Sequence, residues 1–291
     1  MSGTGMALVA GRAEWVKFRT VRSTTWSLLA LVGLSVLFSA LACWESHTEG
    51  GSPGRPPDSD IVLQSLSGIW FGQIAAAVLG VLAITSEYST RLIRATLAAV
   101  PRRRTVLAAK TAVVGAAVVL VGLATSVTCF LIGQELLSGN SFTHENGYPA
   151  TSLADGATLR AVAGSALYLG LLAMFSVGVG AVVRHTAGAI TSVLALLLGP
   201  VIAISFLPEG VAHLVEKTAL LAAGLAIQQT IKSPDALPLG PWTGLGVVTA
   251  YAAAALLGAF WLIARRRRLG LAAQRAKTGE GPAAAEPSPA A

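Results

Sequence analysis

Long apolar blocks alternate with polar connectors along this chain. Six blocks contain no Asp, Glu, Lys or Arg: 24–43, 66–85, 111–133, 161–183, 187–207 and 242–264. Each has about 20 residues or more, and a helix of that length crosses a hydrocarbon core of about 30 Å. A charged residue at the centre of such a helix costs about 2.5–3.5 kcal/mol, so six uncharged blocks are a strong signal. The pattern predicts an all-α polytopic membrane protein with six transmembrane helices.

The segments that join the blocks alternate in charge. One set carries 17 of the 21 Lys and Arg residues and four acidic residues: 1–23, 86–110, 184–186 and 265–291. The other set carries four basic and ten acidic residues. Because basic residues favour the cytoplasmic side of a membrane, the N- and C-termini are both expected in the cytoplasm. The net charge of +7 then reflects membrane orientation, and nucleic acid is not expected as a partner.

One further apolar segment, 218–231, is only 14 residues long and lies between two lysines. It also contains two glutamines, Gln228 and Gln229. Its length fits an interfacial or re-entrant helix better than a seventh span. We therefore expect a short helix of this kind within an outer region, 208–241.

The remaining segments set the expected domain boundaries. Residues 1–23 combine basic side chains with Trp15 and Phe18, a composition that suits the headgroup region, so a cytoplasmic interfacial helix is expected there. The six-span domain is expected to cover 24–268. Residues 269–291 are rich in Ala, Pro and Glu, which predicts a disordered cytoplasmic tail.

Catalytic and metal-binding motifs are absent from the sequence. It contains no G-x-x-x-x-G-K-[ST] loop, no G-x-S-x-G and no H-E-x-x-H, and its four histidines are scattered. We therefore expect no catalytic residue, no metal and no cofactor, and no enzymatic activity of the chain itself. Cys43 and Cys129 lie near the ends of two spans that run in the same direction, so a disulfide is conceivable. The favoured interpretation is that each is a small buried apolar side chain.

The spans also lack the groups that ion-coupled carriers use. Such carriers commonly place Asp, Glu or His inside the bundle, where protonation changes conformation. Here the spans offer only Gln73, Cys, Ser and Thr as polar groups of this kind. If the chain moves a substrate, the energy is expected from another protein in the cytoplasm.

The connector 86–110 has the pattern of a short amphipathic helix over 89–100. Leu92, Ile93, Leu97 and other apolar residues share one face of this helix, and Arg91 and Arg94 share the other. Proline at position 101 ends it, and three arginines follow. Two interpretations stay open on physical grounds. The helix lies on anionic lipid, or it docks its apolar face into a groove on a cytoplasmic protein.

Two segments carry a resemblance to a known family. The pairing of EWVKFRTVRSTTW before the first span with TSEYSTRLIRATLAAVPRRR after the second resembles the type-2 ABC exporter permeases, especially the small actinobacterial ones. The resemblance covers roughly residues 10–268. It implies an elbow helix at 8–23, a coupling helix at 89–100 and short extracytoplasmic helices within 208–231. The chain departs from the family in having Arg91-Leu92 where a Gly-Thr pair often follows the Glu-Tyr.

The resemblance also implies partners. Members have two six-helix halves, and each half contacts a separate cytoplasmic ABC ATP-binding protein. The implied function is that of the membrane-spanning permease subunit of an exporter in the bacterial cell membrane. Its partners would be the ATP-binding protein, a second permease half in a homo- or heterodimer, and the lipid bilayer. The candidate partner-coupling residues are Glu87, Arg91, Leu92, Ile93, Arg94, Leu97, Arg102, Arg103 and Arg104.

Gly68 and Gly72 form a G-x-x-x-G pair in the second span. Such a pair lets helices approach closely, either between two permease halves or within one chain. Two rival functions stay open beside the exporter. One is a secondary carrier driven by an ion gradient, and the other is a non-transporting membrane anchor or sensor that recruits a soluble partner.

Overall fold

The computed structural model describes residues 11–12, 14–16, 20–46, 60–89, 103–140, 142, 148, 151–231 and 239–278. Within these ranges the chain is helical and contains no strand. The long helices are α2 (Arg22–Glu45), α4 (Ile69–Ser89), α6 (Arg103–Gly139), α7 (Gly156–Val183), α8 (Thr186–Ile204) and α11 (Pro241–Thr278). The short elements are α3 (Ile61–Ser65), α9 (Glu209–Thr218), α10 (Leu220–Leu225) and the 3-10 turn η2 (Ala226–Gln228). The six long helices are each apolar and long enough to cross a membrane, which confirms the prediction of an all-α multi-pass membrane protein.

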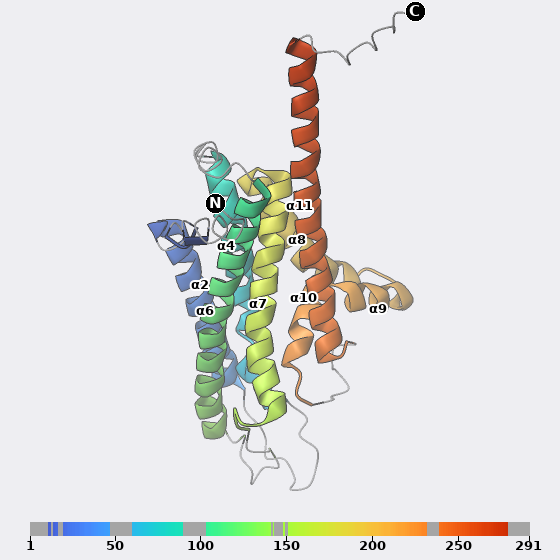
Figure 1. Cartoon of the computed structure of the whole chain (residues 1–291). Coiled ribbons are helices and arrows are strands. Elements are labelled where there is room, and N and C mark those ends of the chain that lie inside the picture. Colours follow the sequence, from blue (N-terminus) through green and yellow to red (C-terminus); the bar gives the residue numbers. More distant parts are fainter. Residues whose placement is uncertain are drawn as a thin grey trace, which may run out of the picture.

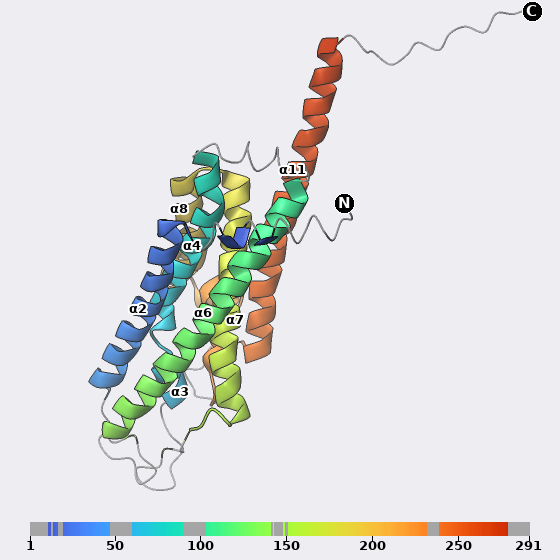
Figure 2. The same cartoon turned by 60° about the vertical axis from the view of Figure 1, so that its left-hand side comes forward.

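Helix α7 forms the centre of the bundle (Figures 1 and 2). It is buried along most of its length and packs against α4, α6 and α11. Helix α2 packs on the outside of α4 and α6, and α8 packs against α4 and α7. Small residues allow these close approaches. For example, a Cβ at Gly80 of α4 would overlap the carbonyl oxygen of Ala173 in α7, and one at Gly178 of α7 would meet Ala255 of α11.

The G-x-x-x-G pair packs within the chain. A Cβ at Gly68 would overlap the carbonyl oxygen of Ser35 in α2, and a Cβ at Gly72 would overlap the side-chain oxygen of the same serine. Both glycines therefore allow the N-terminal end of α4 to lie against α2. This contact explains their spacing without a second copy of the chain, and their role in a dimer stays a prediction.

Five of the six long helices are longer than the apolar blocks that predicted them, and α8, which ends at Ile204, is shorter than the block 187–207. Hydropathy marks only the part of a helix that lies in lipid, whereas backbone hydrogen bonding continues into the polar flanks. The largest difference is in α11, which stays helical to Thr278 and extends well beyond the bundle (Figure 1). The expected disorder is therefore wrong for residues 269–278, where Ala, Leu, Arg, Gln and Lys all favour a helix. The rest of that tail lies outside the described residues.

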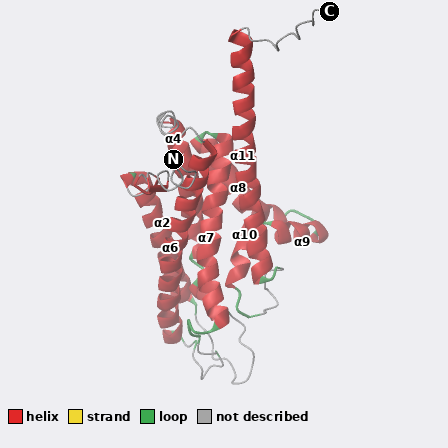
Figure 3. Ribbon diagram, in the orientation of Figure 1, coloured by secondary structure: helices red, strands yellow, loops and turns green. Residues whose placement is uncertain are grey.

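The expected short helix near 218–231 is present as two different elements. Helices α9 and α10 are bent by 58° at a break around Ala219, which has extended backbone angles. Residues 220–224 and 226–228 are buried among the spans, whereas α9 projects away from the bundle (Figure 3). The sequence placed the start of the element at Thr218, but Thr218 is the last residue of α9.

Candidate functional site

Charged side chains gather at the two opposite ends of the bundle. At one end lie the end of α4, the start of α6, the turn between α7 and α8, and the exit of α11 from the bundle (Figures 1 and 2). We call it the basic end because its described charged residues are mainly Arg22, Arg104, Lys110, Arg184 and Arg265. The acidic end carries Glu45, Asp60, Glu135 and Asp155, with Arg160 among them. The alternating charge of the connectors therefore becomes a separation of charge along the bundle axis.

Only the flanks of the predicted partner-coupling residues are described. Glu87 lies in the last turn of α4, and Arg103 and Arg104 form the first turn of α6, where Arg104 is exposed. The connector between these two helices therefore starts and ends at the basic end. The remaining members of the set lie outside the described residues: Arg91, Leu92, Ile93, Arg94, Leu97 and Arg102. The coupling role of the set stays a prediction.

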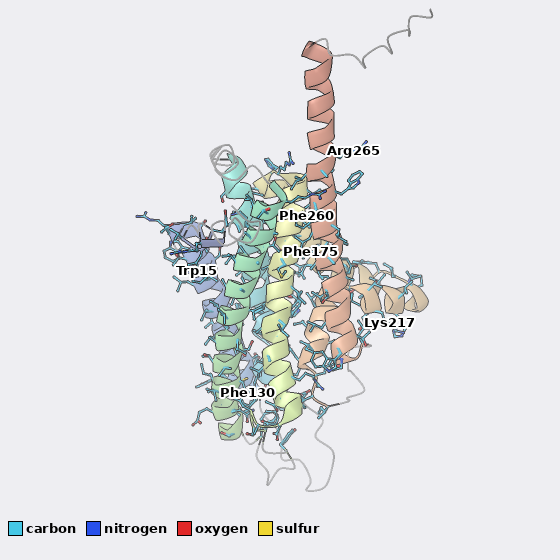
Figure 4. All side chains as sticks on the ribbon, viewed as in Figure 1. Trp15, Phe130, Phe175, Lys217, Phe260 and Arg265 are labelled. Atoms are coloured by element: carbon cyan, nitrogen blue, oxygen red, sulfur yellow. The ribbon has the colours of Figure 1, made fainter. Side chains whose placement is uncertain are left out.

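A buried ion pair joins the N-terminal segment to α6 at the basic end. The Lys110 ammonium donates a hydrogen bond to the Glu14 carboxylate, and both side chains are only about 5% exposed. Lys110 lies two turns into α6 and is the last residue of the connector 86–110, which was predicted as the coupling segment. The neighbouring Trp15 is partly exposed at the edge of the bundle near the start of α2 (Figure 4). The pair therefore holds the segment that precedes the first span against the first turns of the third.

This ion pair is expected to be sensitive to any change in either partner. Moving two charges out of water costs several kcal/mol for each ion, and their attraction offsets that cost only while both are present. Sequence reasoning missed the contact because its partners are 96 residues apart. A signal was available, since Glu14 is the lone acid among four bases in the N-terminal segment and Lys110 begins an apolar block.

The turn between α7 and α8 is the tightest connection at the basic end. Arg184 has a φ of 60°, in the left-handed region, and its N–H donates to the carbonyl of Gly180 at 2.9 Å. His185 then begins α8, because its Nδ1 accepts a hydrogen bond from the Gly188 N–H at 3.1 Å. Glycine usually occupies the position that Arg184 holds, because an L side chain is strained there.

Polar contacts inside the bundle are between uncharged groups. The Tyr168 hydroxyl of α7 donates to the side-chain oxygen of Gln73 in α4, and both residues are fully buried. The Gln228 amide of η2 donates to the Ser165 hydroxyl at 3.0 Å. Among the described residues, the Glu14–Lys110 pair alone places an acidic carboxylate or an ammonium group in a buried position. No group of three His, Cys, Asp or Glu side chains that could hold a metal occurs in the described ranges.

Cys43 and Cys129 are both free and buried. The thiol of Cys43 approaches the Gln64 carbonyl at 3.7 Å. The two residues thus pack as small side chains in the structure.

The Asp60 carboxylate joins two distant segments at the acidic end. Asp60 accepts hydrogen bonds from the Val62 and Leu63 N–H groups, both at 3.1 Å, and so caps α3. It also accepts from the Thr230 N–H at 2.5 Å, the Thr230 hydroxyl at 2.7 Å and the Ile231 N–H at 3.2 Å. These bonds tie the chain that follows η2 to the segment that precedes the second span.

Arg160 of α7 also binds the chain that follows η2. Its guanidinium donates to the Gln229 carbonyl at 2.5 Å. The chain between η2 and α11 is thus bound to α3 on one side and α7 on the other. These contacts could not be found by sequence reasoning, since 170 residues separate Asp60 from Thr230.

No protein-family model matches the chain, and a search of the curated proteins finds no match. The site must therefore be interpreted from its own residues.

Proposed function

We propose that the chain is the membrane-spanning permease subunit of an ATP-binding-cassette exporter in a bacterial cell membrane. A separate cytoplasmic subunit hydrolyses ATP, and a second permease half completes the pathway. In this proposal the basic end faces the cytoplasm, because Lys and Arg favour that side of a membrane. Both termini then lie in the cytoplasm as well.

The observation that carries the proposal is the arrangement of the basic end. A short charged connector joins α4 to α6 there, and the Glu14–Lys110 pair fixes the N-terminal segment to α6 two turns after α6 begins. A push on the connector would reach α4, α6 and the N-terminal segment together. This is the arrangement that a subunit needs when it converts the movement of a cytoplasmic partner into tilting of its spans.

The uncharged contacts inside the bundle favour a cytoplasmic partner, rather than an ion gradient, as the source of energy for transport. Away from the basic end, the buried hydrogen bonds between two side chains in the described part of the bundle are Gln–Tyr and Gln–Ser, and these groups do not change charge in the physiological pH range. Ion-coupled carriers use ionisable groups at such positions. Helices α4 and α7 are therefore suited to moving as packed bodies when a partner pushes on one end.

Co-purification tests the proposed partner. The full chain, purified from native membranes, should bring an ATP-binding-cassette protein with it. Replacing Arg91→Glu together with Arg94→Glu should abolish this recruitment, because the two arginines are proposed to pair with acidic side chains at the rim of the partner groove, and glutamates there would be repelled. The matched control is Arg275→Glu with Lys277→Glu, which changes the net charge by the same amount at the far end of α11. Equal recovery of the partner with both double variants would refute the docking role.

Transport in sealed vesicles separates the exporter from its rivals. Efflux should require ATP and the co-purified partner, and it should survive collapse of the proton gradient. Efflux that stops with the proton gradient and continues without ATP would identify a secondary carrier instead. Partner recruitment without any flux would identify a membrane anchor or sensor.

A further inference from the structure

Exposed tryptophans lie near both ends of two outer helices. Helix α2 carries Trp26 near the basic end and Trp44 near the acidic end, and α11 carries Trp261 and Trp242 in the corresponding positions. All four side chains are 59–71% exposed. Because indole rings favour the headgroup level at the two faces of a membrane, these four residues indicate where the bilayer surrounds the bundle.

The spacing of these tryptophans matches a bilayer on both helices. Trp26 and Trp44 are 18 residues apart, which at 1.5 Å per residue is about 27 Å. Trp242 and Trp261 are 19 residues apart, or about 29 Å. Both lengths are close to the thickness of the hydrocarbon core, about 30 Å. Arg265 lies one turn beyond Trp261, roughly 6 Å outside this boundary, which is the level of the lipid headgroups.

Helix α11 presents an exposed stripe that ends at this arginine. Leu257, Trp261 and Arg265 are all exposed, and they share one face of the helix because they are four residues apart. On the other side of the helix, Ala252 and Ala259 are buried against the bundle. The Arg265 guanidinium lies over the Trp261 ring, with Cζ at 5.2 Å from the ring centroid. The stripe therefore joins an apolar surface at membrane depth to a cation at headgroup depth.

Positive charge continues along the helix beyond the stripe. Residues 265–268 are all arginine, and α11 runs through them without a break to Thr278. Figure 4 labels Arg265 at the level where α11 leaves the bundle. With 3.6 residues per turn, position 268 lies within about 60° of the face that carries Arg265. The sequence has no acidic residue from 265 to 278, so the charge of these arginines is not neutralised within this part of the helix.

We propose that this stripe of α11 binds an anionic phospholipid. The lipid phosphate pairs with Arg265, the charge of the three arginines that follow adds to the attraction, and one acyl chain lies along Trp261 and Leu257. Clusters of basic residues immediately outside a span bind anionic lipid in this way. A lipid fits better than a free phosphate, because the cation is continuous with about 12 Å of exposed apolar helix between positions 257 and 265. The inference does not depend on the transport proposal.

Lipid titration of the full chain tests the role of the arginines. The protein in detergent is titrated with phosphatidylglycerol or with phosphatidylcholine of the same acyl chains, and bound lipid is counted by native mass spectrometry. The test variant is Arg265→Gln with Arg268→Gln. The matched control is Arg275→Gln with Lys277→Gln, which removes the same charge about 15 Å farther along α11, beyond the Debye length at physiological salt.

The expected result is a selective loss of phosphatidylglycerol. Each basic residue near an anionic headgroup contributes a factor of about five, so the test variant should bind phosphatidylglycerol about 25-fold more weakly. Phosphatidylcholine binding should not change, and the control should stay within about twofold of the natural chain. Arg265→Lys with Arg268→Lys keeps the charge and should keep most of the preference, which separates lost binding from lost folding.

Three results of the titration would overturn the inference. One is equal affinity of the natural chain for the two lipids. Another is equal loss of phosphatidylglycerol in the test and control variants, which would mean attraction by net charge alone. The third is displacement of phosphatidylglycerol by inorganic phosphate at concentrations where chloride of equal ionic strength has no effect, since the site would then take its phosphate from water.

Fluorescence quenching tests the position of the acyl chain. The full chain and its Trp261→Phe variant are reconstituted in vesicles that contain lipid brominated near the headgroup end of its chains, and the difference between them gives the quenching of Trp261. At equal mole fraction, brominated phosphatidylglycerol should quench Trp261 several-fold more than brominated phosphatidylcholine. Equal quenching would mean ordinary contact with the bilayer, and no quenching by either lipid would mean that protein covers the stripe. Each of these two results would refute the proposed site.

Discussion

Replacement of Glu14 by glutamine tests the physical interpretation of the basic end most directly. Glu14→Gln keeps the shape of the side chain and removes its charge, so the buried Lys110 ammonium loses the Glu14 carboxylate that accepts its hydrogen bond. Breaking a buried ion pair from one side costs about 3–5 kcal/mol, whereas a solvated surface pair is worth about 0–1 kcal/mol. Both side chains are about 5% exposed, so we expect the larger range. At about 1.4 kcal/mol for each factor of ten, the docking equilibrium of the N-terminal segment should fall by a hundredfold or more.

Hydrogen exchange measured by mass spectrometry, on protein in lipid nanodiscs, provides the assay. Peptides that cover residues 11–20 should lose protection in Glu14→Gln, while peptides from α7 should keep theirs. Glu135→Gln makes the same chemical change at an exposed carboxylate of the acidic end and should leave residues 11–20 unchanged. Combining Glu14→Gln with Lys110→Met removes the buried ammonium as well, so protection should partly return. A loss of less than about fivefold in Glu14→Gln would place the pair in the solvated range and refute the reasoning.

Three further changes test other parts of the bundle. Arg184→Gly should raise the free energy of unfolding by about 1 kcal/mol, because glycine is not strained at a φ of 60°; a lower thermal midpoint in detergent would contradict this. Gly68→Ala should destabilise the protein by about 2 kcal/mol or more by forcing α4 away from the α2 backbone, whereas Gly258→Ala, which meets open space, should be neutral or slightly stabilising in the same melt. Tyr168→Phe should cost about 1–3 kcal/mol by leaving the Gln73 oxygen unsatisfied, and the added change Gln73→Leu should recover part of that loss; additive effects in denaturant titrations would refute the contact.

The number and approximate positions of the spans could be predicted because the relevant signal is local. The absence of charge over about 20 residues reports directly on burial in lipid, and each of the six blocks corresponds to a long helix. The ends of the helices could not be located in this way. In α11, for example, Arg265 ends the apolar block, but the helix continues because arginine itself favours helix.

The contacts that join distant segments were not predictable from one sequence. Glu14 stands out as a lone acid among bases, but nothing near it identifies Lys110 as its partner, and nothing near Asp60 indicates Thr230. Such pairs depend on how the packed helices bring their ends together. The break at Ala219 was missed for a related reason. Mean hydropathy groups residues 218–231 together, whereas in the structure Thr218 ends α9 and the residues after Ala219 form the buried elements α10 and η2.

Because α11 continues beyond the bundle without a break, a tilt of its membrane-embedded part displaces its far end. From Arg265 to Thr278 the helix runs on for 14 residues, which at 1.5 Å per residue is roughly 21 Å beyond the last apolar turn. Because the helix is continuous, tilting the membrane-embedded part by about 10° would swing the tip by roughly 4 Å over that length. A fluorescent donor and acceptor placed on that tip and on the start of α6 would therefore magnify small rearrangements of the spans into a distance change that single molecules can report.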